Sequence, residues 1–140
     1  YYQDVGEIMA TNATWTVVFE DKFIIKQTGS DAGTGYTIND DAFWSESKFS
    51  NIWAIQYQNS VITDEVEYRD ETPNSTYADA NLGDFQQFID LWDAANLAQL
   101  QSNWDNDNLR IEDPEGEDPP VFRDETEAEK IARLGARPTS

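Results

Sequence analysis

The chain has 140 residues, of which 39% are apolar and 13% aromatic, so it can bury one substantial core. Its 28 acidic against nine basic residues give a formal net charge of −19, which repels nucleic acid and anionic membranes. Cysteine and histidine are absent, which excludes disulfides, thiolate chemistry and the commonest zinc and acid–base side chains. We therefore expect no enzyme, no cofactor, no metal, and no direct binding to nucleic acid or membrane.

The N-terminal residues lack a charged-then-apolar leader pattern, and no apolar run reaches the roughly 18 residues that cross a bilayer. The only methionine is Met9. Residues 1–8 are therefore interpreted as a non-native or disordered segment, the alternative being that an earlier start has been removed. Residues 9–111 are expected to form the folded domain.

Residues 15–27, WTVVFEDKFIIKQ, contain two β-branched and aromatic runs around a short charged turn, which predicts a hairpin. Alternate residues from Trp15 to Phe19 share one face, and Val18 and Ile24 point to the other. Apolar residues on both faces indicate that other strands or a partner cover the hairpin. We therefore name Val18 and Ile24 as candidate partner contacts at a sheet edge.

Residues 28–41 are rich in glycine and small polar residues and are expected to form a loop, with a brief edge strand at 36–38. The aromatic residues within 43–49 are expected to form an irregular cap over one end of the sheet.

Residues 51–74, NIWAIQYQNSVITDEVEYRDETPN, read as the central antiparallel hairpin of the sheet. Alternation places Trp53 on one face with Ile55 and Tyr57. In the second strand, Val66 points to the core while its acidic neighbours point to water.

A long helix is predicted from Asp84, its N-cap, with Gln87 in capping-box position. Its apolar stripe is expected to pack on the sheet before the Asn/Asp cluster 103–108 ends the helix. The members of the stripe are Phe85, Phe88, Ile89, Trp92, Ala95, Leu100 and Trp104.

Residues 112–123 are acidic and proline-rich, which is typical of an extended linker. Residues 124–140 then contain a short amphipathic helix, opened by a capping box at 124–127 and closed by Gly135. A neutral amphipathic helix at the end of an acidic linker is suited to binding a groove on a partner protein. The alternative is that this terminus is frayed. The candidate contacts of this flexible arm are Val121, Phe122, Ala128, Ile131 and Leu134.

Other groups of residues give weaker indications of a function. The acidic cluster that follows Trp104 lacks a calcium loop's glycine, because Arg110 stands at that position. Adjacent carboxylates leave a glycosidase-type pair open, but 28 acids produce such pairs by composition. Two further alternatives are a DNA-mimicking inhibitor and a sugar-binding protein. The aromatic residues considered for a sugar or peptide groove are Trp44, Trp53, Tyr57, Tyr68 and Trp92.

The strand 51–57, NIWAIQY, followed by EVEYRD at 65–70 and TPN at 72–74, resembles small accessory proteins encoded beside tail-fibre genes in tailed bacteriophages, including marine T4-like ones. Glu71 departs from that pattern, where a glycine is expected. The resemblance covers about 50 residues, and its motifs are structural rather than catalytic. It implies a virion component or tail-fibre assembly factor that binds a phage tail or fibre protein, in the virion or in the host cytoplasm during assembly.

Together these features predict an α+β fold: an antiparallel sheet of four or five strands, one long helix packed on a face, and a flexible C-terminal arm with a short helix.

Overall fold

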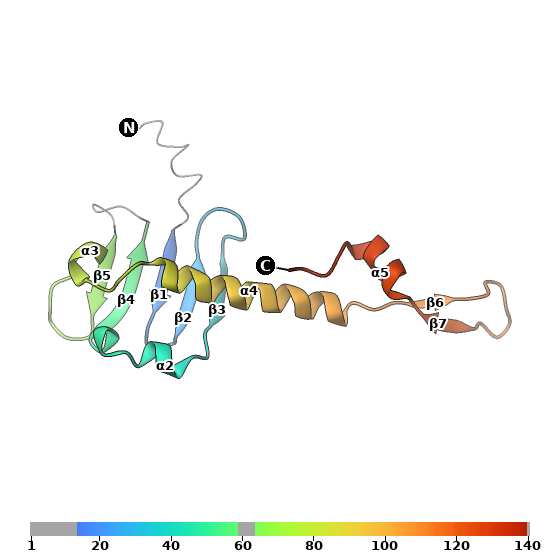
Figure 1. The fold of residues 1–140 in the computed structure, drawn as a ribbon, viewed down its shortest axis with the longest axis horizontal. Coiled ribbons are helices and arrows are strands. Elements are labelled where there is room, and N and C mark those ends of the chain that lie inside the picture. The colour runs from blue at the N-terminus through green and yellow to red at the C-terminus, as the bar shows by residue number, and fades with distance from the viewer. Residues whose placement is uncertain (1–13, 59–63, 140) are drawn as a thin grey trace, which may run out of the picture. The chain divides into compact units, whose positions relative to one another are not determined.

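The computed structural model describes residues 14–58 and 64–139 and shows an α+β protein, as predicted (Figure 1). The chain divides into two compact units, residues 1–93 and 94–140. The segment 1–8, expected to be non-native or disordered, lies outside the described residues.

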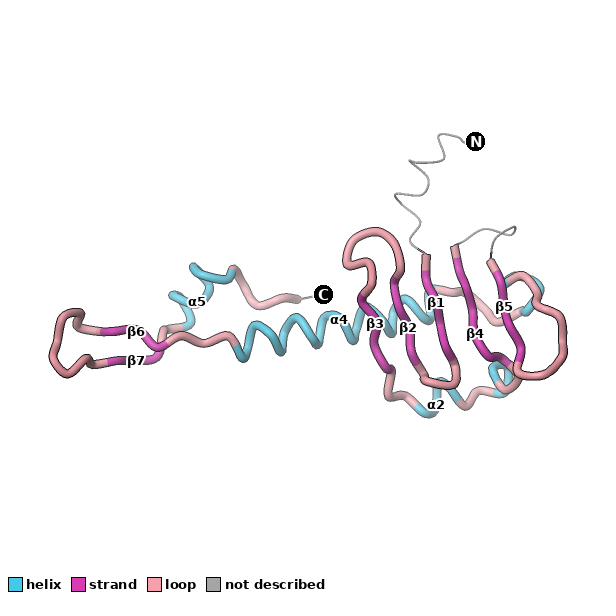
Figure 2. Tube along the Cα trace, turned by 180° about the vertical axis from the view of Figure 1, so that it is seen from behind, coloured by secondary structure: helices cyan, strands magenta, loops and turns pink. Residues whose placement is uncertain are grey.

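The N-terminal unit is built on a five-stranded antiparallel sheet in the order β3-β2-β1-β4-β5 (Figure 2). Because β1 is the central strand, the prediction that residues 15–27 supply a sheet edge is wrong; the edges are β3 and β5. The strands are β1 Trp15–Val18, β2 Phe23–Lys26, β3 Thr34–Thr37, β4 Ile52–Tyr57 and β5 Glu65–Tyr68.

The turn between β1 and β2 decides which residues of β2 face the core. Val18 pairs with Phe23 and Val17 with Ile24, and directly paired residues of antiparallel strands share a face. Ile24 is therefore on the core side with Val17, and its exposed fraction is 0%. Its assignment as a partner contact is wrong, because the register set by the turn could not be read from alternation within each strand. Val18 lies on the opposite face and is half-buried.

The central hairpin forms as predicted, β4 pairing with β5, but with a register shift between Ile52 and Ala54. The irregularity interrupts strict alternation. Ile52 and Ile55 are both buried, whereas Trp53 is 43% exposed. The expectation that Trp53 lies on one face with Ile55 is therefore wrong.

Three short helical segments and the first part of a long helix complete the unit. The long helix begins close to the predicted cap: the Asp84 carboxylate accepts from the Gln86 backbone N–H at 2.9 Å. Gln87 does not complete a capping box there, since its side-chain amide donates to the Leu82 carbonyl. The helices are α2 Asp41–Trp44, η1 Ser47–Phe49, α3 Tyr77–Ala80 and α4 Gln86–Asn106.

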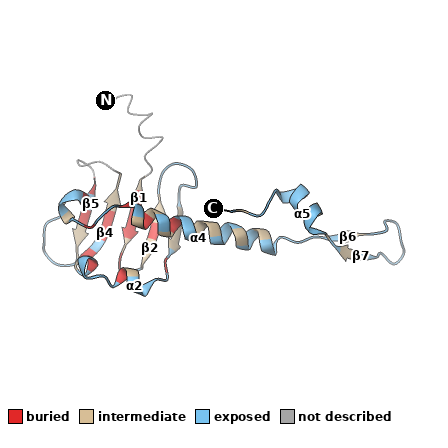
Figure 3. Cartoon of the chain, viewed as in Figure 1, coloured by how far each residue is buried: buried red, intermediate tan, exposed pale blue. Residues whose placement is uncertain are grey.

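The first turns of α4 lie over one face of the sheet (Figure 3), and their Phe88 and Trp92 are buried. Trp92 meets Trp15 edge to face at 5.3 Å between ring centroids, and Phe85 stacks on Tyr57 at 3.8 Å. Such ring pairs contribute about 0.5–1.5 kcal/mol each beyond their burial. The predicted packing of helix on sheet is confirmed for this part of α4.

The C-terminal unit contains the rest of α4, a two-stranded ribbon of β6 (Arg110–Glu112) and β7 (Phe122–Asp124), and α5 (Glu127–Leu134). The segment 112–123, expected to be an extended linker, is thus the loop of a hairpin with the adjoining ends of its two strands. Composition missed it because the strands are only three residues long. Helix α5 has its capping box at Thr126 and Glu129, two residues later than predicted, and ends at Gly135 as predicted.

Substitution of Gly35 by alanine should destabilise the sheet. An added Cβ would lie 2.3 Å from Cζ of Phe23 and 3.0 Å from Cβ of Ile25. Overpacking of this kind costs about 1–3 kcal/mol. Urea denaturation should show a lower free energy of unfolding, and the double variant G35A/F23L, which frees the space, should recover part of it. An unchanged midpoint for G35A would contradict this packing.

Candidate functional site

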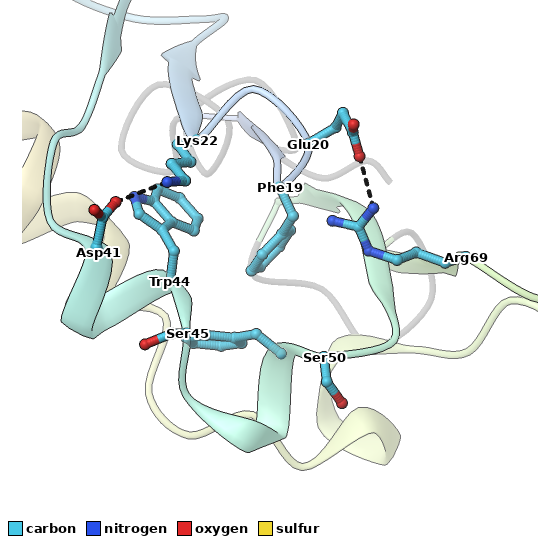
Figure 4. Close-up of a pocket in the computed structure, with 9 residues that line it drawn as sticks. Phe19, Glu20, Lys22, Asp41, Trp44, Ser45, Ser50 and Arg69 are labelled. Atoms are coloured by element: carbon cyan, nitrogen blue, oxygen red, sulfur yellow. Dashed lines mark hydrogen bonds and ion pairs between the residues drawn. The ribbon is translucent and has the colours of Figure 1, made fainter.

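A cavity of about 490 Å³ opens between the β1–β2 turn and the segment around α2 and η1, all within the N-terminal unit (Figure 4). Aromatic side chains form its floor and charged side chains its rim. It is lined by Phe19, Glu20, Lys22, Asp41, Trp44, Ser45, Phe49, Ser50 and Arg69.

Two ion pairs hold the rim. Lys22 Nζ lies 2.7 Å from an Asp41 carboxylate oxygen, and an Arg69 guanidinium nitrogen lies 2.7 Å from Glu20. The hydrogen bond and charge of Lys22 lower the pKa of Asp41 below its usual value. Asp41 is thus held ionised beside a cation, whereas a general acid at neutral pH needs a raised pKa. The Glu20 carboxylate is engaged by Arg69.

The floor offers little surface to a ligand. Trp44 donates from its indole nitrogen to the Ile38 carbonyl at 2.9 Å and packs edge to face on Phe19 at 5.2 Å. Trp44, Phe19 and Phe49 are only 9%, 6% and 2% exposed. Their rings are core residues, and stacking of a sugar needs an open ring face.

The aromatic residues considered for a sugar or peptide groove do not come together as one surface. Trp92 is 2% exposed and Tyr57 stacks on Phe85. Tyr68 shares a 2.7 Å hydrogen bond with the Ser75 hydroxyl, and Trp53 is exposed beside the Arg69 guanidinium at 5.7 Å.

The described residues contain no cluster of three or more acidic, His or Cys side chains that could hold a metal ion. In the acidic segment compared with a calcium loop, two carboxylates are paired with cations of the same unit. Asp105 is paired with Arg137 at 2.8 Å and Asp107 with Arg133 at 3.0 Å.

The C-terminal unit carries most of the exposed large apolar side chains among the described residues. Of the seven large apolar side chains that are exposed in the described residues, Trp53 alone belongs to the N-terminal unit. We call the other six the C-terminal apolar surface: Leu100, Leu109, Val121, Phe122, Ile131 and Leu134, which are 38–50% exposed.

Most of the predicted contact residues of the arm belong to this surface. Val121, Phe122, Ile131 and Leu134 are members, and Ala128 is exposed as well. Sequence reasoning missed Leu109, and it placed Leu100 in a stripe facing the sheet.

Trp104, the last member of the predicted stripe, also packs elsewhere. Its indole nitrogen donates to the Gly135 carbonyl at 3.0 Å, and the Lys130 ammonium lies 4.1 Å from its ring centroid. The stripe thus packs on the sheet in the first turns of α4, and Trp104 packs within the C-terminal unit.

Polar contacts hold the C-terminal unit together. Lys130 is its only buried residue among those described, and its ammonium donates to Asn108 at 2.7 Å. Arg123 makes two hydrogen bonds of 2.8 Å to Glu129, and it also pairs with Asp113. The Arg123 hydrogen bonds, followed by a backbone bond from Thr126, lower the pKa of Glu129 from 4.5 to about 2.

Comparison with protein families, curated proteins and solved structures finds no match to this chain. Within residues 14–58 and 64–139, no helix combines the length and the apolar character needed to cross a membrane.

Proposed function

We propose that this protein is a non-enzymatic, tail-associated bacteriophage protein that binds another phage structural protein through the C-terminal apolar surface. It would act as a virion component or a tail-fibre assembly factor, in the virion or in the host cytoplasm during assembly. The observation that supports binding is a folded unit whose described part buries no apolar side chain yet exposes six large ones. The phage assignment rests on the resemblance of residues 51–74.

Energetics favour a partner for such a unit. Full burial of a large apolar side chain is worth about 1.5–3 kcal/mol relative to exposure. An isolated two-stranded ribbon and an eight-residue helix are each marginal in water. A protein surface that covered Phe122, Ile131 and Leu134 would stabilise the unit and gain affinity from the same contacts.

The alternatives gain less support. A DNA mimic needs many carboxylates that stand free like phosphates. Four carboxylates of this unit are each paired with one of its arginines, which leaves Glu115, Glu117 and Asp118 as a small group that is free of ion pairs among the described residues; the paired ones are Asp105, Asp107, Glu125 and Glu129. A sugar-binding protein needs open aromatic faces, and the cavity of the N-terminal unit has nearly closed ones.

Binding to the purified products of the genes that flank this one tests the proposal. We expect one tail or fibre protein to bind in calorimetry, and Ile131→Ser/Leu134→Ser to weaken its affinity at least tenfold. Trp53→Ser, which removes an equally exposed apolar side chain of the other unit, is the matched control and should bind normally.

Failure of every flanking tail protein to bind, or equal affinity of the double variant and the control, would overturn the proposal. Binding that duplex DNA competes away would instead favour the mimic.

A further inference from the structure

The end of the β6–β7 hairpin joins acidic residues to exposed apolar ones. Its segment 112–118, EDPEGED, holds five acids and no base. Val121 and Phe122 follow after two prolines and are 48% and 50% exposed. We call residues 112–122 the hairpin tip.

The charge that the tip offers to a partner is negative, because the bases of the C-terminal unit are engaged within it. Each of its four arginines pairs with at least one carboxylate, and Lys130 lies over Trp104. Glu115, Glu117 and Asp118, by contrast, enter no ion pair in the part of the chain that the structure describes.

The ribbon also leaves apolar groups uncovered. Phe122 pairs with Glu112 and Ile111 with Arg123, so Phe122 stands beside a carboxylate on one face. The ribbon has two strands of three residues and no third strand among the described residues. Phe122 is half exposed, so the face of the ribbon that carries it is open to a partner.

We propose that the hairpin tip inserts Val121 and Phe122 into an apolar cleft of the partner protein that is rimmed by arginine or lysine side chains. This deepens the proposed function and rests on it. Apolar burial would supply affinity, and attraction between the rim and Glu115, Glu117 and Asp118 would set orientation and association rate. Binding should therefore weaken as salt rises.

A second copy of this chain fits the tip poorly. Each copy carries a net charge of −19, so two copies repel one another. The cations at the rim of the N-terminal cavity, Lys22 and Arg69, are already neutralised by Asp41 and Glu20. The occupant is therefore a different, locally basic protein surface.

Synthetic peptides test the chemistry of the occupant on the full-length protein. The probes are an 18-residue peptide alternating arginine and leucine, a second with serine in place of leucine, and a third with glutamate in place of arginine. In NMR titrations we expect the arginine–leucine peptide to shift amide resonances of residues 112–124. The arginine–serine peptide should bind at least tenfold more weakly, and the glutamate–leucine peptide should not bind.

Variants localise the effect. Glu115→Lys/Glu117→Lys and, separately, Phe122→Ser should each raise the dissociation constant of the arginine–leucine peptide at least tenfold. Asp21→Lys/Glu71→Lys makes the same change in net charge at exposed acids of the other unit and is the matched control. It should bind nearly as the unaltered protein does.

Shifts spread over the whole acidic surface, equal weakening by the control pair, or normal binding by Phe122→Ser would overturn the proposal. The two proposals can fail separately. If Ile131→Ser/Leu134→Ser abolished binding of the tail protein but Glu115→Lys/Glu117→Lys did not, the role of the hairpin tip would be disproved and the proposed function would remain.

Discussion

Replacing Phe88 by alanine is expected to lower the free energy of unfolding of the N-terminal unit by about 3–5 kcal/mol, the range for a fully buried phenylalanine. Phe88 is 0% exposed. Its ring lies 5.0 Å from that of Phe85, 5.5 Å from Phe43 and 6.0 Å from Phe19. The substitution would leave a cavity where the helix meets the sheet.

Urea denaturation followed by tryptophan fluorescence measures the effect. The control is Phe122→Ala, which deletes the same atoms from a side chain that is 50% exposed and should change stability by less than about 0.5 kcal/mol. Equal effects of the two variants would mean that α4 does not seal the core.

Acidification is expected to unfold the C-terminal unit while the N-terminal unit stays folded. The pKa of Glu129 is lowered from 4.5 to about 2 by Arg123, and those of Glu125 and Asp105 are lowered by Arg133 and Arg137. A carboxylate whose folded pKa is depressed contributes stability above its unfolded pKa and loses it as pH falls through the folded value. The contribution is therefore complete above about pH 5 and disappears between pH 4.5 and 2.

Hydrogen exchange at a series of pH values, corrected for intrinsic rates, separates the units. Amides of α5 should lose protection below pH 4.5, and those of β1 and β4 should keep it. Glu129→Gln should weaken α5 already at pH 7, and 1 M salt should act in the same direction because exposed pairs are screened. Simultaneous loss of protection in both units would show that apolar packing, rather than the arginine network, holds α5.

Sequence patterns predicted the helices and strands better than the contacts these elements make. Alternation in 51–57 and 65–68 identified the central hairpin, and the three- and four-residue spacing of Phe85, Phe88 and Trp92 identified the helix on the sheet. These patterns repeat over several residues, which is why they were readable.

Features set by single contacts could not be read. The register of the β1–β2 turn buried Ile24, and one irregularity in β4 exposed Trp53. The stripe of α4 continues to Trp104, but periodicity does not say what a helix face contacts, and the Trp104 ring lies against Lys130 of its own unit. The three-residue strands of the β6–β7 hairpin are too short for any period to appear.

The candidate surface was partly predictable. Amphipathic spacing in α5 indicated Ile131 and Leu134, and both are exposed. The exposure of Leu109 and the arginine–carboxylate pairs within the unit depend on contacts between distant segments. Arg137 and Asp105, for example, are 32 residues apart. Composition alone could not place them.

The strand order also sets the pace at which the sheet can assemble. The pairings of β1 with β2, β2 with β3 and β4 with β5 each join neighbours along the chain, whereas β1 and β4 join Trp15 to Tyr57. Closing that longer loop costs entropy before any contact repays it, so docking of a three-stranded meander onto the later hairpin should be the slow kinetic step. Until it occurs, the two strands that end up innermost are bare edges, and crowded refolding would favour their pairing with the wrong chain.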